Sequence, residues 1–347
     1  MLIVMDHEAT PQQVEGVCDA VRRLGLTPKP MPGAERTAIG IVGNDGPIDP
    51  ARFHGLPGVR EAVSISAPYK QVSREWHARD SVIALPNGTR IGGDHVVVMG
   101  GPCSVESEAQ LMATAEVVAR SGATVLRGGA FKPRTSPYAF QGLGHEGLRL
   151  LAKARDRFGL AIVTEALDVA NLDAVAEAAD IVQVGARNMQ NYALLKQLGR
   201  IGKPVLLKRG MAATVKEWLL AAEYIIAKGN PEVILCARGI RGFDSATRNV
   251  LDVGSIALVK QLSHLPVIAD PSHATGVREL VVPTARAAVA AGADGVIVET
   301  HPKPCEALSD GQQALFPAQF GEMVDQLGVI AAAIGRSMHP SQARSAA

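Results

Sequence analysis

From His95 onward the sequence repeats one unit, a short apolar run followed by a helix-like stretch. The apolar runs begin near residues 95, 123, 160, 180, 204, 232, 266 and 294. The helix-like stretches lie at 106–121, 145–158, 169–178, 190–198, 214–228, 252–260, 277–291 and 313–334. Eight such units over about 240 residues match the number and length of a (β/α)8 barrel. An open doubly wound sheet would have fewer strands, and no Gly-x-Gly-x-x-Gly turn follows the first run. We therefore predict a catalytic barrel over residues 95–335.

Residues 1–75 are predicted to form a separate domain. An apolar strand at 2–5 comes first, and Thr10 and Pro11 then start a helix that ends at Gly25. Further strands are expected at 26–31, 37–42 and 59–65, with a short helix at 49–55. The order βαββαβ is that of a ferredoxin-like fold. Small domains of this order often bind an amino acid or pair with a second copy, so we expect a regulatory role.

Two further segments complete the expected organisation. Residues 76–94 link the domains and contain Asn87-Gly88 between short extended runs, which is a strong hairpin signal. We interpret this hairpin as a cap over the bottom of the barrel, without chemistry. The tail at 336–347 contains Ser, Pro and Ala and is predicted to be disordered.

Composition and charge exclude several classes of protein. The 347 residues are 47% hydrophobic, enough for a large core, and their net charge of +1 gives no basic footprint for nucleic acid. No apolar run approaches the roughly 18–20 residues that cross a bilayer, and the N-terminal run is too short for a signal peptide. We expect a cytoplasmic protein with free thiols rather than disulfides. Its cysteines are Cys18, Cys103, Cys236 and Cys305.

Cationic residues gather where the predicted barrel strands end, which is where active sites of this fold lie. They are Arg127, Lys132, Arg134, Arg187, Lys208 and Arg238. Like charges in one mouth repel each other, and an anionic ligand offsets that repulsion. Arginine in particular suits phosphate and carboxylate through paired hydrogen bonds. One such residue is as often a solvated surface cation, but six on one rim indicate substrates with several negative charges.

A second group of strand-end residues offers ligands for a metal. Cys103 follows the first barrel strand, His273 the seventh, and Glu299 and Asp310 the eighth. These strands are neighbours once the barrel closes, so the side chains can converge. A thiolate, an imidazole and two carboxylates could hold a divalent transition ion. Singly, Cys103 is more often a buried thiol and His273 a hydrogen-bonded rim residue, but the four together favour a metal site.

Four segments closely resemble those of one enzyme family. They read Gly-Gly-Pro-Cys-Ser-Val-Glu (100–106), Lys-Pro-Arg-Thr-Ser-Pro-Tyr (132–138), Ala-Asp-Pro-Ser-His (269–273) and the stretch 299–310. In this order they resemble the 3-deoxy-D-arabino-heptulosonate 7-phosphate (DAHP) synthases, more narrowly the type I beta subclass without large barrel insertions. The resemblance covers the whole barrel, and the N-terminal unit matches the regulatory domain of some members. It implies the first step of the shikimate pathway, a transferase reaction that joins phosphoenolpyruvate to erythrose 4-phosphate.

The resemblance also implies a role for each position. A divalent metal, Mn2+ or alternatively Fe2+, Co2+ or Zn2+, would be held by Cys103, His273, Glu299 and Asp310. Phosphoenolpyruvate would be bound by Arg127, Lys132, Lys208 and Arg238, with Glu165, Ala186 and Arg187 completing its phosphate site. The phosphate of erythrose 4-phosphate would be bound by Arg134 and Thr135, helped by Arg187 and Asn188. Lys132 is the candidate proton donor, and His273 is the alternative, although metal ligation would compete with that role.

Partners and alternatives follow from the same resemblance. It suggests feedback inhibition by tyrosine or phenylalanine and a homotetramer. The related 3-deoxy-D-manno-octulosonate 8-phosphate synthases use arabinose 5-phosphate instead, but Pro133 fixes the substrate-binding loop and favours the shorter aldose. A catalytically inactive amino-acid sensor is a second alternative, although this chain retains every expected ligand. Cys305 is most simply an exposed thiol, and a further hypothesis is that oxidation joins it to Cys103 and expels the metal.

Overall fold

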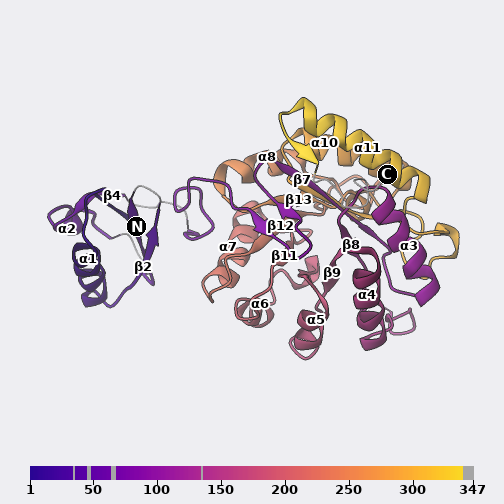
Figure 1. The fold of residues 1–347 in the computed structure, drawn as a ribbon, viewed down its shortest axis with the longest axis horizontal. Helices are drawn as coiled ribbons and strands as arrows, with labels where there is room; N and C mark the ends of the chain where they lie inside the picture. Colours follow the sequence, from indigo (N-terminus) through magenta and orange to yellow (C-terminus); the bar gives the residue numbers. More distant parts are fainter. Residues whose placement is uncertain (34–35, 45–47, 64–67, 134–135, 339–347) are drawn as a thin grey trace. The chain divides into compact units, whose positions relative to one another are not determined.

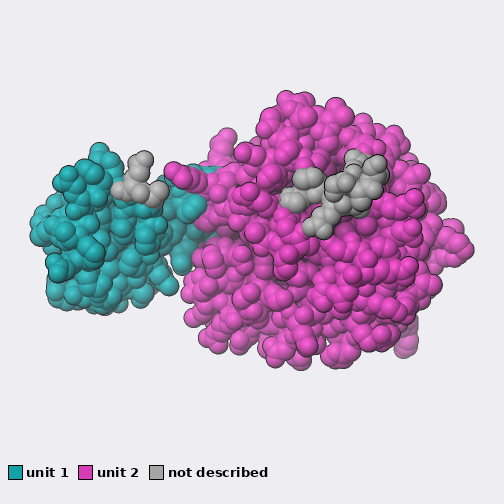
Figure 2. Space-filling view, viewed as in Figure 1, with its two compact units in different colours: residues 1–78 teal, residues 79–347 magenta. Residues whose placement is uncertain are grey.

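The structure, a computed structural model, describes residues 1–33, 36–44, 48–63, 68–133 and 136–338. The chain divides into two compact units, residues 1–78 and 79–347 (Figures 1 and 2). No helix in the described part of the chain is long and apolar enough to span a membrane.

The smaller unit is an antiparallel sheet with two helices. Its strands are ordered β2 (Thr27–Pro32), β3 (Thr37–Val42), β1 (Leu2–Met5) and β4 (Val59–Val63). Its helices are α1 (Pro11–Arg23) and α2 (Ala51–His54). Helix α1 begins as predicted, because the Thr10 hydroxyl accepts a hydrogen bond from the backbone N–H of Gln13 while Pro11 occupies the first turn. The predicted ferredoxin-like order is confirmed.

The smaller unit extends a few residues beyond its expected end at 75. A methyl group placed on Gly40 of β3 would lie 1.7 Å from the ring of Trp76. The indole therefore packs directly on the strand where glycine leaves room for it. This contact ties the start of the connecting segment to the first unit.

The larger unit is the predicted (β/α)8 barrel. Its parallel strands are β7 (His95–Gly101), β8 (Val125–Arg127), β9 (Ala161–Glu165), β10 (Ile181–Val184), β11 (Val205–Lys208), β12 (Val233–Ala237), β13 (Val267–Ala269) and β14 (Gly295–Glu299). Pairing of β14 with β7 closes the cylinder. The surrounding helices are α3 (Glu108–Arg120), α4 (His145–Phe158), α5 (Leu172–Ala178), α6 (Tyr192–Leu198), α7 (Val215–Ile226), α8 (Val253–Leu262), α10 (Arg278–Ala290) and α11 (Pro317–Ala333). Figure 1 shows these helices around the strands.

The expected hairpin closes the amino-terminal end of the barrel. It consists of β5 (Ile83–Ala84) and β6 (Arg90–Ile91), and its buried isoleucines belong to the same apolar cluster as the inward-facing strand residues. The Asn87 side chain donates to the carbonyl oxygens of Thr124 and Gly159, which precede β8 and β9. The hairpin thus lies opposite the end where the strands finish, and it leaves that end free for chemistry.

The end of the described chain differs from the disordered tail expected from residue 336. Arg336 donates to the buried carboxylate of Asp294 at 2.6 Å and to the carbonyl oxygens of Gly93 and His95. Strand β15 (Ser337–Met338) then pairs with β7. The ion pair with Asp294 holds Arg336 in place, and the composition of the tail gives no sign of this partner. Residues 339–347 lie outside the described residues.

Candidate active site

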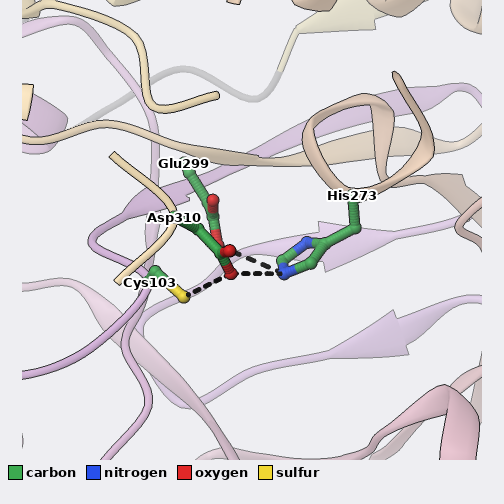
Figure 3. A group of neighbouring side chains, drawn as sticks. All are labelled: Cys103, His273, Glu299 and Asp310. Carbon is green, nitrogen blue, oxygen red and sulfur yellow. Dashed lines mark hydrogen bonds and ion pairs between the residues drawn. The ribbon is translucent and has the colours of Figure 1, made fainter. Parts of the chain in front are cut away.

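Four potential metal ligands meet at the carboxyl end of the barrel. Cys103 follows β7, His273 lies on the short helix α9 (Pro271–Thr275), Glu299 ends β14, and Asp310 lies on the loop after it. One donor atom from each residue lies within 4.8 Å of the donor atoms of the others. Figure 3 shows the four side chains pointing toward a common point. The structure therefore brings together the complete set that the sequence predicted.

The distances among these side chains are short enough for one ion to reach all of them. His273 Nε2 lies 3.2 Å from Glu299 Oε1 and 4.0 Å from Asp310 Oδ2. Cys103 Sγ donates to Asp310 Oδ2 at 3.2 Å. Glu299 is 1% exposed and Cys103 3% exposed, so their negative forms need a positive neighbour. The mixed sulfur, nitrogen and oxygen donors suit a divalent transition ion.

The protonation states of the ligands follow from their surroundings. Burial raises the pKa of the Cys103 thiol to about 11, and the carboxylate of Glu299 adds to this effect. Burial alone would raise the pKa of Asp310, but His273 and the hydrogen bond from Cys103 bring it down to about 2. Burial also opposes ionisation of Glu299, but His273 and Arg127 lower its pKa, so both carboxylates are ionised at neutral pH. The thiol loses its proton when it binds a metal, because the thiolate is the ligand form.

Asp270 orients the imidazole of His273 from behind. Its carboxylate lies 2.9 Å from His273 Nδ1 and caps α9 by accepting from the backbone N–H of His273. Lys208 donates to the same carboxylate at 2.5 Å. Although burial opposes ionisation, His273 and Lys208 hold the pKa of Asp270 well below its usual range. A carboxylate on Nδ1 leaves Nε2 facing the other ligands, as in many metal sites.

A cavity of about 390 Å³ opens beside the four ligands. Its walls include these predicted substrate-binding residues: Arg127, Lys132, Pro133, Glu165, Ala186, Arg187, Asn188, Lys208 and Arg238. Two further predicted residues, Arg134 and Thr135, lie outside the described residues. The five described cations of the predicted rim thus line one cavity next to the ligand cluster.

The residues that line the cavity include more arginines and lysines than aspartates and glutamates, so the wall has an excess of positive charge. Arg238 is 9% exposed, and its Nη1 has no hydrogen-bond partner in the described parts of the chain. Burial lowers the pKa of Arg238, Asp270 acts in the opposite direction, and the neighbouring cations Arg248 and Arg187 lower the pKa further. A buried donor without an acceptor is costly. An anion in the cavity would supply the acceptor and relieve the repulsion.

Lys132 joins the cavity to the ligand cluster. Its ammonium group donates to the Cys103 carbonyl oxygen at 3.0 Å and approaches Cys103 Sγ at 3.1 Å. Arg127 makes a second link, because its guanidinium donates to Glu299 at 2.9 Å. A group bound in the cavity therefore meets cations that also contact the ligands.

Several site residues escaped sequence analysis. Arg241, Arg248 and Asn249 line the cavity from the connection between β12 and α8, and Arg248 lies 3.3 Å from Asp310. Asp270 was part of a quoted motif but received no role. The available signals were the unusual length of that connection, since long loops in compact domains are often functional, and the spacing of Asp270 three residues before His273, which is typical of a helix cap.

Two protein-family models match this chain. The model described as the DAHP synthetase I family matches residues 76–332, and the model described as the DAHP synthase ferredoxin-like domain matches residues 1–67. The chain belongs to the DAHP synthetase I family. The predicted family, and the predicted type of enzyme, are confirmed.

Individual relatives of the family agree over most of the chain. A phospho-2-dehydro-3-deoxyheptonate aldolase of Thermotoga maritima is 48% identical over 335 residues, 96% of this chain and 99% of the relative. A crystal structure of the DAHP synthase from the same organism has a TM-score of 0.78 and 47% identity, and the match covers 97% of this chain and 99% of that one. A 2-dehydro-3-deoxyphosphooctonate aldolase of Acidithiobacillus ferrooxidans is 34% identical over 252 residues, 67% of this chain and 87% of the relative.

Proposed function

We propose that the barrel condenses phosphoenolpyruvate with erythrose 4-phosphate to give DAHP and phosphate, the first step of the shikimate pathway. The observation that carries this proposal is the cluster of four ligands beside a cavity lined by cations. Both substrates are anionic phosphate esters, which such a wall would attract. The nearly full-length similarity to a phospho-2-dehydro-3-deoxyheptonate aldolase supports the same reaction.

The proposed cofactor is a divalent metal, Mn2+ or alternatively Fe2+, Co2+ or Zn2+, held by Cys103, His273, Glu299 and Asp310. When bound, the ion would act as a Lewis acid toward the aldehyde oxygen of erythrose 4-phosphate. The softness of the sulfur donor favours transition ions over Mg2+ and Ca2+. Asp270 supports this assignment, because its hydrogen bond fixes the ligand nitrogen of His273.

The proposed substrate contacts are those that the family resemblance implies, and the described ones among them line the cavity. Phosphoenolpyruvate would be held by Arg127, Lys132, Lys208 and Arg238, with Glu165, Ala186 and Arg187 around its phosphate. Arg134, Thr135 and Asn188 would bind the phosphate of erythrose 4-phosphate. The buried, unpartnered Nη1 of Arg238 supports an anion at the first of these sites. Contacts of this kind would hold the two reacting carbons side by side and so lower the entropic part of the activation barrier.

Lys132 is the proposed general acid. The methylene carbon of phosphoenolpyruvate would add to the aldehyde carbon, and the former carbonyl oxygen would take a proton from the Lys132 ammonium group. Water would then attack the cationic carbon and return one proton to Lys132. As the carbon–oxygen bond to phosphate breaks and the ketone forms, the second proton of that water would leave with the phosphate. His273 suits this role less well, because Asp270 occupies Nδ1 and Nε2 faces the ligand cluster.

An assay with both aldose phosphates tests the proposal. Metal-loaded protein is expected to release phosphate from phosphoenolpyruvate with erythrose 4-phosphate at least about tenfold faster, in kcat/KM, than with arabinose 5-phosphate. Chelation should abolish turnover, and Mn2+ should restore it. Preference for arabinose 5-phosphate would favour the octulosonate alternative, which the 34% identical relative represents. No phosphate release with either sugar would favour the inactive amino-acid sensor.

We further propose that the ferredoxin-like unit is regulatory and that tyrosine or phenylalanine is the inhibitor. The match of residues 1–67 to the DAHP synthase ferredoxin-like domain supports a regulatory attachment. A cytoplasmic homotetramer is the proposed assembly and location.

A further inference from the structure

The loop that carries Asp310 adopts a backbone conformation that needs support. Asp310 has a φ of 51°, the one positive value among the described residues other than glycine. Side chains other than glycine rarely occupy this left-handed region unless the surroundings fix it. The base of the loop is closed by backbone hydrogen bonds, from Leu315 N–H to the Glu299 oxygen at 2.8 Å and from His301 N–H to the Leu315 oxygen at 3.1 Å. Those bonds lie several residues away from Asp310.

Within the loop, the Gln313 N–H donates to the Asp310 oxygen at 3.1 Å, and further support comes from the loop that carries Cys103. The hydroxyl groups of Ser104 and Ser309 lie 2.5 Å apart, and both residues are buried. The carboxylate of Glu106 accepts from the backbone N–H of Leu308 at 2.9 Å. Each of these contacts joins a close sequence neighbour of Cys103 to a close sequence neighbour of Asp310. Two ligands that are far apart in the sequence are therefore tied together by contacts other than the metal.

Glu106 also contacts the beginning of the same loop. Its Oε2 lies 3.4 Å from Nε2 of His301, which is 6% exposed. This contact lacks the geometry of a hydrogen bond, and that nitrogen has no hydrogen-bond partner among the described residues. The other imidazole nitrogen accepts from the backbone N–H of Lys303 at 3.0 Å. One carboxylate thus meets the loop both near its start and near Asp310.

We infer that Glu106 is a positioning residue for the metal centre. It holds the 300–311 loop against the loop after β7 and so sets the separation between Asp310 and Cys103. The inference rests on the proposed function only in that a metal occupies the cluster. Without this contact, the 300–311 loop keeps fewer bonds to the loop after β7, so more of its ordering accompanies ion binding, and that entropy weakens binding. Loss of outer contacts to metal ligands typically weakens metal affinity by about 10- to 100-fold.

Glu106→Ala tests the inference by direct measurement of metal binding. Mn2+ affinity is measured by electron paramagnetic resonance of the free ion, and release of bound Mn2+ is followed after addition of a chelator. We expect affinity to fall about 10- to 100-fold and release to accelerate. At saturating Mn2+, the KM for phosphoenolpyruvate should stay at the wild-type value, because Glu106 does not line the cavity. The Mn2+ affinity of Glu106→Gln should lie between those of the wild type and Glu106→Ala, since the glutamine amide oxygen can still accept from the backbone N–H of Leu308.

Glu306→Ala is the matched control. Glu306 lies on the same loop, is exposed and pairs with Lys303 at 3.1 Å, so the variant removes the same charge without touching the contacts to the loop after β7. Its Mn2+ affinity should equal that of the wild type. Circular dichroism checks folding, and if Glu106→Ala does not fold, Glu106→Gln and Ser309→Ala carry the measurement, each with weaker binding expected.

The results separate this inference from the proposed function. Wild-type affinity and release in the folded Glu106 variants would overturn the inference, as would a wild-type protein that binds no Mn2+. A wild-type protein that binds Mn2+ but yields no product would overturn the proposed reaction, while weaker binding in the Glu106 variants would still support the positioning role.

Discussion

At the scale of single residues, burial separates the cysteines of the barrel into two kinds. Cys305 is exposed, whereas Cys103 and Cys236 are buried. Cys236 lies in the interior of the barrel on β12, and burial raises the pKa of its thiol to about 12. An unperturbed thiol has a pKa of about 8.5. The folded barrel therefore keeps this proton over a pH range in which the unfolded chain releases it.

This difference predicts a loss of stability in alkali. Because the folded pKa of Cys236 is the higher one, its contribution is complete below about pH 8.5 and declines as pH rises toward 12. The decline amounts to about 1.4 kcal/mol per pH unit. Urea unfolding between about pH 9 and pH 10.5 should show a shallower pH dependence of the unfolding free energy in Cys236→Ala than in the wild type. Cys305→Ala, which removes an exposed thiol, should keep the wild-type slope. Parallel slopes for Cys236→Ala and wild type would contradict the prediction.

Residue types and strand ends were enough to predict the ligand cluster. Cys103 and His273 lie within a few residues after barrel strands and Glu299 ends one, and the order of strands in a barrel fixes which of them are neighbours. The role of Asp270 depends on its hydrogen bond to His273 across one helical turn, and the positions of the strand ends do not predict that bond. Arg248 reaches the site from within a long connection whose path is set by tertiary contacts, so its position could not be predicted from the sequence.

At the scale of elements, Gly101 at the end of β7 shows how tightly two strands approach beside the site. A methyl group placed on it would lie 1.9 Å from the Arg127 carbonyl oxygen, and its φ of 151° is strained for other residues. Pro102 and Cys103 follow directly, so any shift of this backbone moves a proposed metal ligand. Gly328, in the middle of α11, is the opposite case, because the nearest atom to an added methyl would be 3.6 Å away, on Met338.

Two alanine substitutions should therefore change stability in opposite directions. Gly101→Ala is expected to lower the unfolding free energy of the barrel by about 1–3 kcal/mol or more and to weaken Mn2+ binding. Gly328→Ala should raise the unfolding free energy by about 0.5–1 kcal/mol, because alanine loses less backbone entropy in a helix. Urea unfolding measures both. Equal stability and metal affinity in Gly101→Ala and wild type would refute the close approach of β7 and β8.

Periodicity predicted the larger elements because each buries one face against a neighbour. It placed the barrel strands within about two residues of their observed starts, a typical error for boundaries. Short elements were missed. Helix α9 forms in Pro271–Thr275 because Asp270 caps it, and β15 forms because Arg336 finds the buried carboxylate of Asp294. Neither cause leaves a periodic pattern in the sequence.

At the scale of the whole molecule, the two units have separate apolar cores. The core of the smaller unit is built from its sheet and α1, and the barrel core from its strands and hairpin, with no residue in common. Each unit thus has the means to fold independently.

Removal of residues 1–78 tests the division of labour. The protein reduced to residues 79–347 should retain condensation of phosphoenolpyruvate with erythrose 4-phosphate, because all described ligands and cavity residues belong to that unit. It should lose any inhibition by tyrosine or phenylalanine that the full chain shows. Initial rates of both proteins, with and without each amino acid, give the comparison. If each amino acid inhibits the truncated protein as strongly as the full chain, the ferredoxin-like unit does not have the proposed regulatory role.

The pairing of β14 with β7 places the ligands on both sides of the seam at which the barrel closes. Cys103 follows the first strand of the barrel, whereas Glu299 ends the last one and Asp310 comes later still. Chains are synthesised from the amino terminus and fold progressively as they emerge from the ribosome. A nascent chain that does not yet include β14 contains Cys103 but lacks Glu299 and Asp310. The proposed metal centre is therefore complete only in chains whose translation has passed Asp310, and prematurely terminated products lack part of the ligand set.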